Sequence, residues 1–195
     1  MNWAEQDYLE VGQLAAVPEI LVLVQQATGM GFAAVAHVTE ERWLACAVLD
    51  KINFGLQPGG ELDVGSTLCS EVRGADRPIA IDHVEEDVVY GNHATPKQYG
   101  FQSYISVPIR LPDGQFFGTL CAIDPRPAVV RTDQIIGMFE MFAQLIGFQI
   151  DSQLRLKASQ SDLFDAQQAA KLREQFIAVL GHDLRNPLTA FQSGI

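Results

Sequence analysis

The stretch FIAVLGHDLRNPLTA, residues 176–190, places several reactive side chains within two turns of a predicted helix. His182 and Asn186 are four residues apart, so they share one helix face. Asp183 is adjacent and can hold one ring nitrogen of His182, which leaves the other nitrogen as a nucleophile. This pattern suits an imidazole that accepts a phosphoryl group. Asp183 would act as acid/base, and Asn186 would place a water for the reverse hydrolysis.

An apolar stripe runs along the same stretch at spacings of three and four residues. It comprises Phe176, Val179, Leu180, Leu184 and Leu188. Such a stripe predicts packing against partner helices, with His182 off its centre and facing solvent. Pro187 crowds the carbonyl four residues back and loosens the helix beyond the reactive turn. The alternative is a surface histidine beside a chance proline. We favour the chemical interpretation because the acid, the amide and the proline all fall at useful positions.

The composition excludes several classes of protein. The net charge is −11, from 24 acidic against 13 basic residues. This argues against a nucleic-acid partner and against an anionic membrane surface. No window approaches the ~20 apolar residues of a membrane span, and the acidic start does not resemble a secretory signal. We therefore predict a cytoplasmic chain. Three cysteines without CxxC spacing predict neither a disulfide framework nor a zinc site, so no metal is expected.

The element pattern predicts an α+β domain over residues 1–150. The runs FAAVAHV and RWLACAVL form one expected hairpin. SYISVPIRL and QFFGTLCAI flank PDG and form another, so the sheet should be mainly antiparallel with helices packed on it. Thr132 can cap a helix that starts with DQIIGMFEMF. Its length predicts a helical linker over 151–174, and the apolar stripe within 175–195 predicts a helix that packs against partner helices.

The first two thirds of the chain resemble a GAF domain. The segments that carry the resemblance are GSTLCSEV, RPIAIDHVEED, QYGFQSYISVPI and, most specifically, SVPIRLPDGQFFGTLCAID. The resemblance implies an antiparallel sheet of about six strands with flanking helices, followed here by a long C-terminal signalling helix. It also implies a sensory pocket for a small molecule, but it does not identify the ligand. Candidate pocket residues are Trp43, Tyr99, Phe101 and Tyr104, since ligand sites are mostly apolar.

Three more specific functions are compatible with a GAF segment. A bilin photosensor of the phytochrome-like kind would attach its chromophore through a cysteine, but Asn92 stands there before His93. Redox sensing could use Cys46, Cys69 or Cys121. Cys69 lies near a helix start that would lower its pKa, but all three also suit buried core positions. A GAF-fold methionine sulfoxide reductase would need clustered cysteines. A ligand-free dimerisation scaffold is a further alternative.

The stretch around His182 resembles the H-box of a sensor histidine kinase, and HDLRNPL is its most specific part. The resemblance implies that His182 is the phosphoacceptor, Asp183 the acid/base and Asn186 the phosphatase-associated residue. It also implies a homodimer through the C-terminal helix, ATP as cosubstrate and a response regulator as partner. No Gly-rich ATP-binding segment follows. We therefore expect kinase activity only in the full-length protein and none in this segment alone.

Overall fold

The computed structural model describes the backbone of residues 5–192 and the side chains of residues 8–177. Its helices and strands, in chain order, are α1 (Glu5–Val11), α2 (Ala16–Thr28), β1 (Phe32–Val38), β2 (Trp43–Asp50), β3 (Glu61–Leu62), α3 (Cys69–Ala75), β4 (Ile79–Ile81), α4 (Ala94–Tyr99), β5 (Ser103–Arg110), β6 (Phe116–Asp124) and α5 (Asp133–Gln192). Two short 3₁₀ helices, Val64–Ser66 and Val84–Glu86, lie in the connections. The chain forms two compact units, Met1–Asp151 and Ser152–Ile195.

Six strands form one antiparallel sheet in the order β3-β2-β1-β6-β5-β4. Both predicted hairpins are present: β1 pairs with β2, and β5 pairs with β6 across the PDG turn. β1 is buried along its whole length, so both faces of the sheet are covered at its centre. The predicted architecture, a six-stranded antiparallel sheet with flanking helices and a long C-terminal helix, is confirmed.

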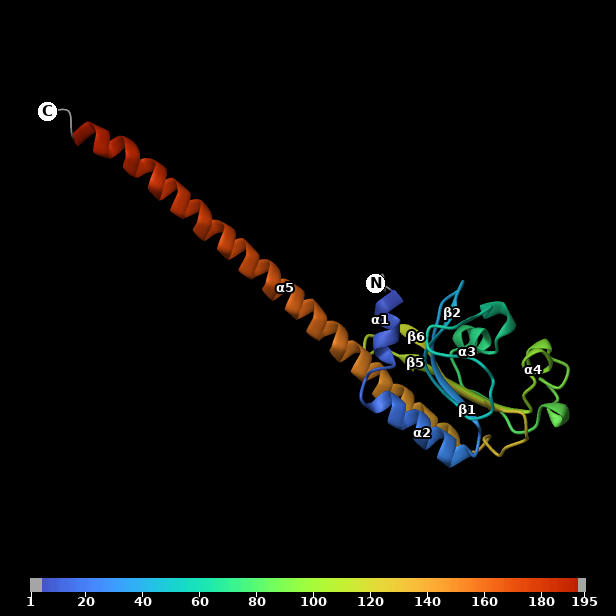
Figure 1. The fold of residues 1–195 in the computed structure, drawn as a ribbon. Coiled ribbons are helices and arrows are strands. Elements are labelled where there is room, and N and C mark those ends of the chain that lie inside the picture. Colours follow the sequence, from blue (N-terminus) through green and yellow to red (C-terminus); the bar gives the residue numbers. More distant parts are fainter. Residues whose placement is uncertain (1–4, 193–195) are drawn as a thin grey trace. The chain divides into compact units, whose positions relative to one another are not determined.

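Different helices cover the two faces of the sheet (Figure 1). One face lies under α3 and the segment that carries α4. The other face packs against α1, α2 and the first turns of α5. Their buried residues recur at spacings of three and four, as expected for amphipathic helices. These residues are Val17, Ile20, Leu21 and Val24 of α2, and Phe139, Ala143, Ile146 and Ile150 of α5. α1 was not predicted, because its acidic sequence has too little periodicity.

The start of α5 is fixed as the sequence predicted. The Thr132 hydroxyl accepts a hydrogen bond from the Ile135 amide at 3.2 Å, and the Thr132 carbonyl accepts one from Ile136 at 2.9 Å. The cap satisfies an amide that the first helical turn leaves without an intrahelical partner. In the second unit, large apolar side chains of α5 are exposed. These are Leu156, Leu163, Phe164, Leu172, Phe176 and Ile177.

His37 of β1 makes the stability of the fold depend on pH. Its ring stacks on Tyr8 of α1 at 4.5 Å and lies 4.8 Å from the Phe117 ring. Burial lowers the pKa of His37 to about 4. The unfolded chain protonates His37 near its ordinary pKa of 6.5, so stability falls as pH decreases from 6.5 to 4.

We expect His37→Phe to remove about 2 kcal/mol of this acid-induced loss while keeping the aromatic stack. Urea unfolding of the parent and the variant between pH 7 and pH 4 measures the free energy of unfolding of each. Carboxylates titrate in both proteins, so the difference between the two pH profiles reports on His37 alone. A variant with the same pH slope as the parent would show that His37 is already neutral in the unfolded state or charged in the folded one.

Candidate functional site

A small cavity lies between the sheet and the segment that carries α3 and α4. All four aromatic residues predicted for a pocket line it: Trp43, Tyr99, Phe101 and Tyr104. The rest of the lining is apolar apart from two threonines and two cysteines. It comprises Phe32, Phe54, Leu56, Leu62, Thr67, Leu68, Cys69, Thr95, Cys121 and Ile123. The cavity measures about 40 Å³, which is room for a few water-sized molecules. Whether the four aromatic residues bind a ligand stays a prediction.

A wider groove of about 480 Å³ lies on the outer side of the same wall. The groove and the cavity share six lining residues: Phe54, Leu56, Leu62, Tyr99, Phe101 and Ile123. The wall is tied in place, because the Tyr99 and Ser66 hydroxyls are hydrogen-bonded at 2.6 Å and the Phe54 ring lies 5.9 Å from the Tyr99 ring. A ligand of ordinary size needs roughly 300–1,000 Å³, so the groove has room for it, whereas the cavity would accept it only if this wall moved.

Sequence reasoning missed Phe54 and Leu56 as lining residues because they lie in a loop. The Asp50 carboxylate fixes this loop by accepting the amides of Ile52 at 3.0 Å and Gly55 at 2.9 Å. The available signal was the apolar spacing of Ile52, Phe54 and Leu56, all of which line the groove, although Asn53 and Gly55 between them have positive φ angles and the segment is not a strand. The turn residues that follow hid this pattern.

The inner end of the cavity carries two interacting thiols. Cys69 and Cys121 are both buried and both line the cavity. The pKa of Cys69 is lower than that of a free thiol. The Cys121 thiol has the largest effect on this pKa, and the hydroxyls of Thr119 and Tyr104 lower it further. Cys69 in turn raises the pKa of Cys121. The predicted direction for Cys69 is therefore right, but side-chain contacts rather than the helix start cause it.

Cys46 differs from the other two cysteines. It lies in β2, is buried and does not line the cavity. Burial raises its pKa to about 12, so its thiol stays protonated at neutral pH.

His93 lies outside the cavity lining and caps a helix. Its Nδ1 accepts the Thr95 amide at 3.2 Å at the start of α4, and its Nε2 lies 3.0 Å from a carboxylate oxygen of Glu71. His93 is thus a half-exposed residue that holds the start of α4. Asn92, at the position expected for a bilin-attaching cysteine, provides no thiol.

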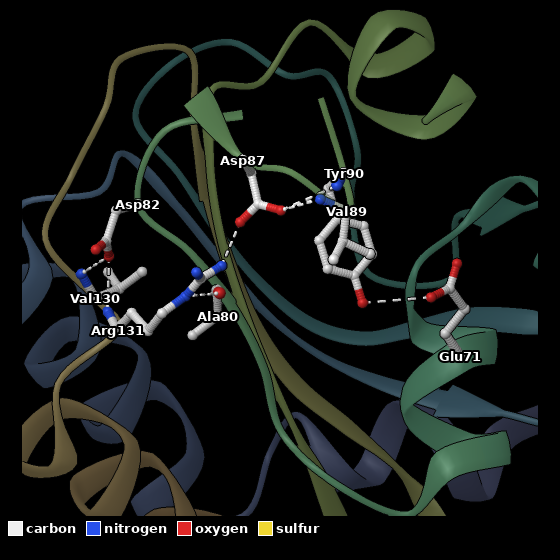
Figure 2. Close-up of polar contacts among 8 residues, drawn as sticks. All are labelled: Glu71, Ala80, Asp82, Asp87, Val89, Tyr90, Val130 and Arg131. Atoms are coloured by element: carbon white, nitrogen blue, oxygen red, sulfur yellow. Dashed lines mark hydrogen bonds and ion pairs between the residues drawn. The ribbon is translucent and has the colours of Figure 1, made fainter. Parts of the chain in front are cut away.

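A polar network joins the α3–α4 side of the domain to the start of α5 (Figure 2). The Asp87 carboxylate accepts the amides of Val89 at 2.9 Å and Tyr90 at 3.0 Å, and it pairs with the Arg131 guanidinium. The Tyr90 hydroxyl donates to Glu71 of α3 at 3.4 Å.

The same arginine is anchored to the sheet. Arg131 donates from Nε to the Ala80 carbonyl at 2.8 Å, and its amide donates to the Asp82 carboxylate at 2.7 Å (Figure 2). Asp82 also accepts the amide of Val130 at 2.7 Å. The two residues before the capping Thr132 are therefore held by two aspartates, Asp82 and Asp87, of the connection between β4 and α4.

The predicted phosphoacceptor group lies outside the described side chains. The backbone of α5 continues through His182, Asp183 and Asn186, but the positions of these three side chains are not described. Within the described part of the chain, no three His, Cys, Asp or Glu side chains gather as a metal would require. Among the same residues, no helix combines the length and apolar character needed to cross a membrane.

The chain belongs to the GAF domain family, whose family model matches residues 14–150. Solved structures with the same fold include the blue-light absorbing form of the PixJ GAF domain from Thermosynechococcus elongatus. It is 12% identical, with a TM-score of 0.63 over 85% of this chain and 98% of that one. A GAF domain region of a putative membrane protein from Geobacter sulfurreducens is 14% identical, with a TM-score of 0.58 over 75% and 96%.

Two further relatives come from enzymes. The type II free methionine-R-sulfoxide reductase of Thermoplasma acidophilum is 15% identical, with a TM-score of 0.54 over 73% of this chain and 96% of that one. The diguanylate cyclase DgcP of Escherichia coli is 37% identical over 60 residues, which are 29% of this chain. The chain spans only 18% of the length of DgcP, and the structural likenesses define the fold alone. The property that the solved structures share with this chain is the fold.

Proposed function

We propose that the chain is the sensory input and phosphoacceptor segment of a cytosolic two-component sensor histidine kinase. The GAF domain would detect a signal, and α5 would carry it to the HDLRNPL stretch. The observation that carries the proposal is one continuous helix: α5 starts at Asp133 against the sensory sheet and includes the whole HDLRNPL motif before Gln192. A sensor and a phosphoacceptor on one continuous helix are connected through the backbone of that helix.

In this proposal, His182 attacks the γ-phosphorus of ATP held by the ATP-binding domain of the full-length protein. A P–N bond forms, the bond to the β–γ bridging oxygen breaks, and ADP leaves. Asp183 takes the ring proton so that the imidazole reacts as a neutral nucleophile. The phosphoryl group then passes to an aspartate of a response regulator, and Asn186 supports the hydrolysis that resets that regulator.

The polar network of Figure 2 supports a route from the pocket side to α5. Asp87 belongs to the connection before α4, whose Tyr99 lines the cavity. Arg131 precedes the cap of α5 and pairs with Asp87. A ligand that displaces the α4 segment would change this ion pair and so favour another arrangement of α5.

Exposed apolar residues of α5 support dimerisation through this helix. Leu156 and Leu163 are seven residues apart and more than half exposed, at 53% and 60%. Leu172 and Phe176 follow at 65% and 66%. Spacings of seven and four suit a helical seam with a second copy, which would bury this surface.

A bilin photosensor remains the alternative function, and two features of the site count against it. The cavity of about 40 Å³ cannot hold a tetrapyrrole without large rearrangement, and Asn92 offers no attachment thiol. Protein expressed with a bilin supply should therefore be colourless. A visible absorption band would favour the photosensor over a sensor of smaller ligands.

The test of the kinase proposal is phosphorylation of the full-length protein. When this chain is joined to its ATP-binding domain and given radioactive ATP, we expect one acid-labile label that peptide mapping assigns to His182. The chain without that domain should remain unlabelled. Label on a serine, threonine or another histidine would contradict the proposal.

A further inference from the structure

The sulfur of Cys69 is surrounded by hydroxyl groups, which is unusual in an otherwise apolar core. The Thr119 hydroxyl donates to Cys69 Sγ at 3.3 Å, and the Tyr104 hydroxyl lies 3.4 Å from it. The Ser106 hydroxyl lies at 4.0 Å. All three residues are at least 96% buried, with exposures of 0%, 4% and 0%. Such donors stabilise a thiolate more than a thiol.

Cys121 is the second thiol at this point. It follows Thr119 by two residues on β6, so both side chains leave the same face of the sheet. Its partner across the β5–β6 ladder is Ser106. Cys121 is flanked on this face by Thr119 along the strand and by Ser106 across it. Both of these residues approach the sulfur of Cys69. Cys121 itself interacts with that sulfur as well.

The cavity beside the two thiols has one more buried donor. Trp43 lines the cavity and is 2% exposed, and its Nε1–H is a further donor that helps to lower the pKa of Cys69. No closer acceptor for this N–H lies among the described residues, so a small oxygen acceptor in the cavity would share it with the sulfur. The volume of about 40 Å³ limits the acceptor to two or three water-sized groups.

We propose that Cys69 and Cys121 form a peroxide-reactive dithiol, with hydrogen peroxide or a similarly small hydroperoxide as its substrate. The Cys69 thiolate attacks one peroxide oxygen, so an S–O bond forms, the O–O bond breaks, and hydroxide leaves as water after taking a proton. The Cys121 thiol then attacks the sulfenic acid. An S–S bond forms, the S–O bond breaks, and a second water carries away the Cys121 proton.

In total, two thiols are oxidised to one disulfide and one hydrogen peroxide is reduced to two waters. The hydroxyls of Thr119 and Tyr104 would hold the thiolate, and the Trp43 N–H would orient the peroxide. The disulfide would join α3 to β6 beneath the cavity. This chemistry goes beyond the proposed kinase function and does not depend on it, since neither His182 nor a dimer takes part.

The test is oxidation of the folded 195-residue chain with hydrogen peroxide, followed by alkylation in denaturant and mass spectrometry. We expect a product that carries one alkyl group, on Cys46, where the reduced chain carries three, with the peptides of Cys69 and Cys121 linked by a disulfide. Cys46 is a control within the same molecule, because its thiol is equally buried but outside the cavity. A linkage through Cys46, or no oxidation of Cys69, would overturn the proposal.

Two variants separate the chemistry from a folding defect. Cys121→Ser should leave Cys69 as a sulfenic acid that dimedone traps, with no intramolecular disulfide. Thr119→Val keeps the side-chain shape but removes the donor, so the pH at which oxidation reaches half its maximum rate should rise by about one unit. Circular dichroism and the melting temperature check the fold of each. An unchanged pH profile in well-folded Thr119→Val would show that Cys69 is not activated at this site.

Discussion

Replacement of His182 with glutamine should abolish phosphorylation of the full-length protein. Glutamine has a similar length and polarity, but its amide nitrogen has no available lone pair to attack phosphorus. Removal of a nucleophile typically costs a factor of about 10³ or more. The measurement is incorporation of radioactive phosphate from ATP at a fixed enzyme concentration.

The matched control is the same substitution at another histidine. His83 is half-exposed and pairs with Glu86 at 3.1 Å, outside the HDLRNPL stretch. His83→Gln should therefore label at the parental rate. Persistent labelling of His182→Gln would contradict the assignment of the phosphoacceptor, whatever the outcome of the peroxide experiment.

The neighbours of His182 should give distinct effects. Asp183→Asn removes the proton acceptor and should slow labelling by about 10²-fold or more. Asn186→Ala should leave labelling near the parental rate and slow dephosphorylation of the response regulator. Equal losses in both reactions for Asn186→Ala would indicate disruption of the helix rather than a role for the amide.

The elements were predictable because local rules determine them. The two hairpins follow from alternating apolar runs around short polar turns, and the start of α5 follows from a threonine before a long periodic segment. The grouping of Trp43, Tyr99, Phe101 and Tyr104 at one cavity also agrees with the prediction. This grouping could be expected because the resemblance to a GAF domain implies the arrangement of the strands and of the pocket beside them.

The size and the polar end of the cavity were not predictable. The volume depends on the rotamers of Phe54 and Tyr99, which no pattern of residue types specifies. The environment of Cys69 depends on Thr119, 50 residues away in the chain. Likewise, Asp87 and Arg131 are 44 residues apart, and neither has a local signature of pairing. Long-range pairs require the tertiary fold before they can be recognised.

The contact between α5 and the sheet gives the second large effect, at Gly147. A Cβ at this position would lie well under 3.0 Å from the carbonyl oxygen of Arg110, the last residue of β5. Neither backbone can yield locally, so α5 would have to move away from the strand. The neighbouring Ile146 and Ile150 are 0% and 1% exposed, and their packing would loosen with it. We expect Gly147→Ala to lower the free energy of unfolding by about 3 kcal/mol.

Gly137 provides the matched control within the same helix. A Cβ there meets no atom within 4 Å. Gly137→Ala should therefore raise stability by up to about 1 kcal/mol, because alanine is the better helix former. Urea unfolding of the two variants should separate them by about 4 kcal/mol in opposite directions from the parent. If both variants were equally stabilised, α5 would not be seated on the end of β5. The proposed signalling route from the sensory sheet to His182 would then lose its structural basis, even if His182 itself were phosphorylated.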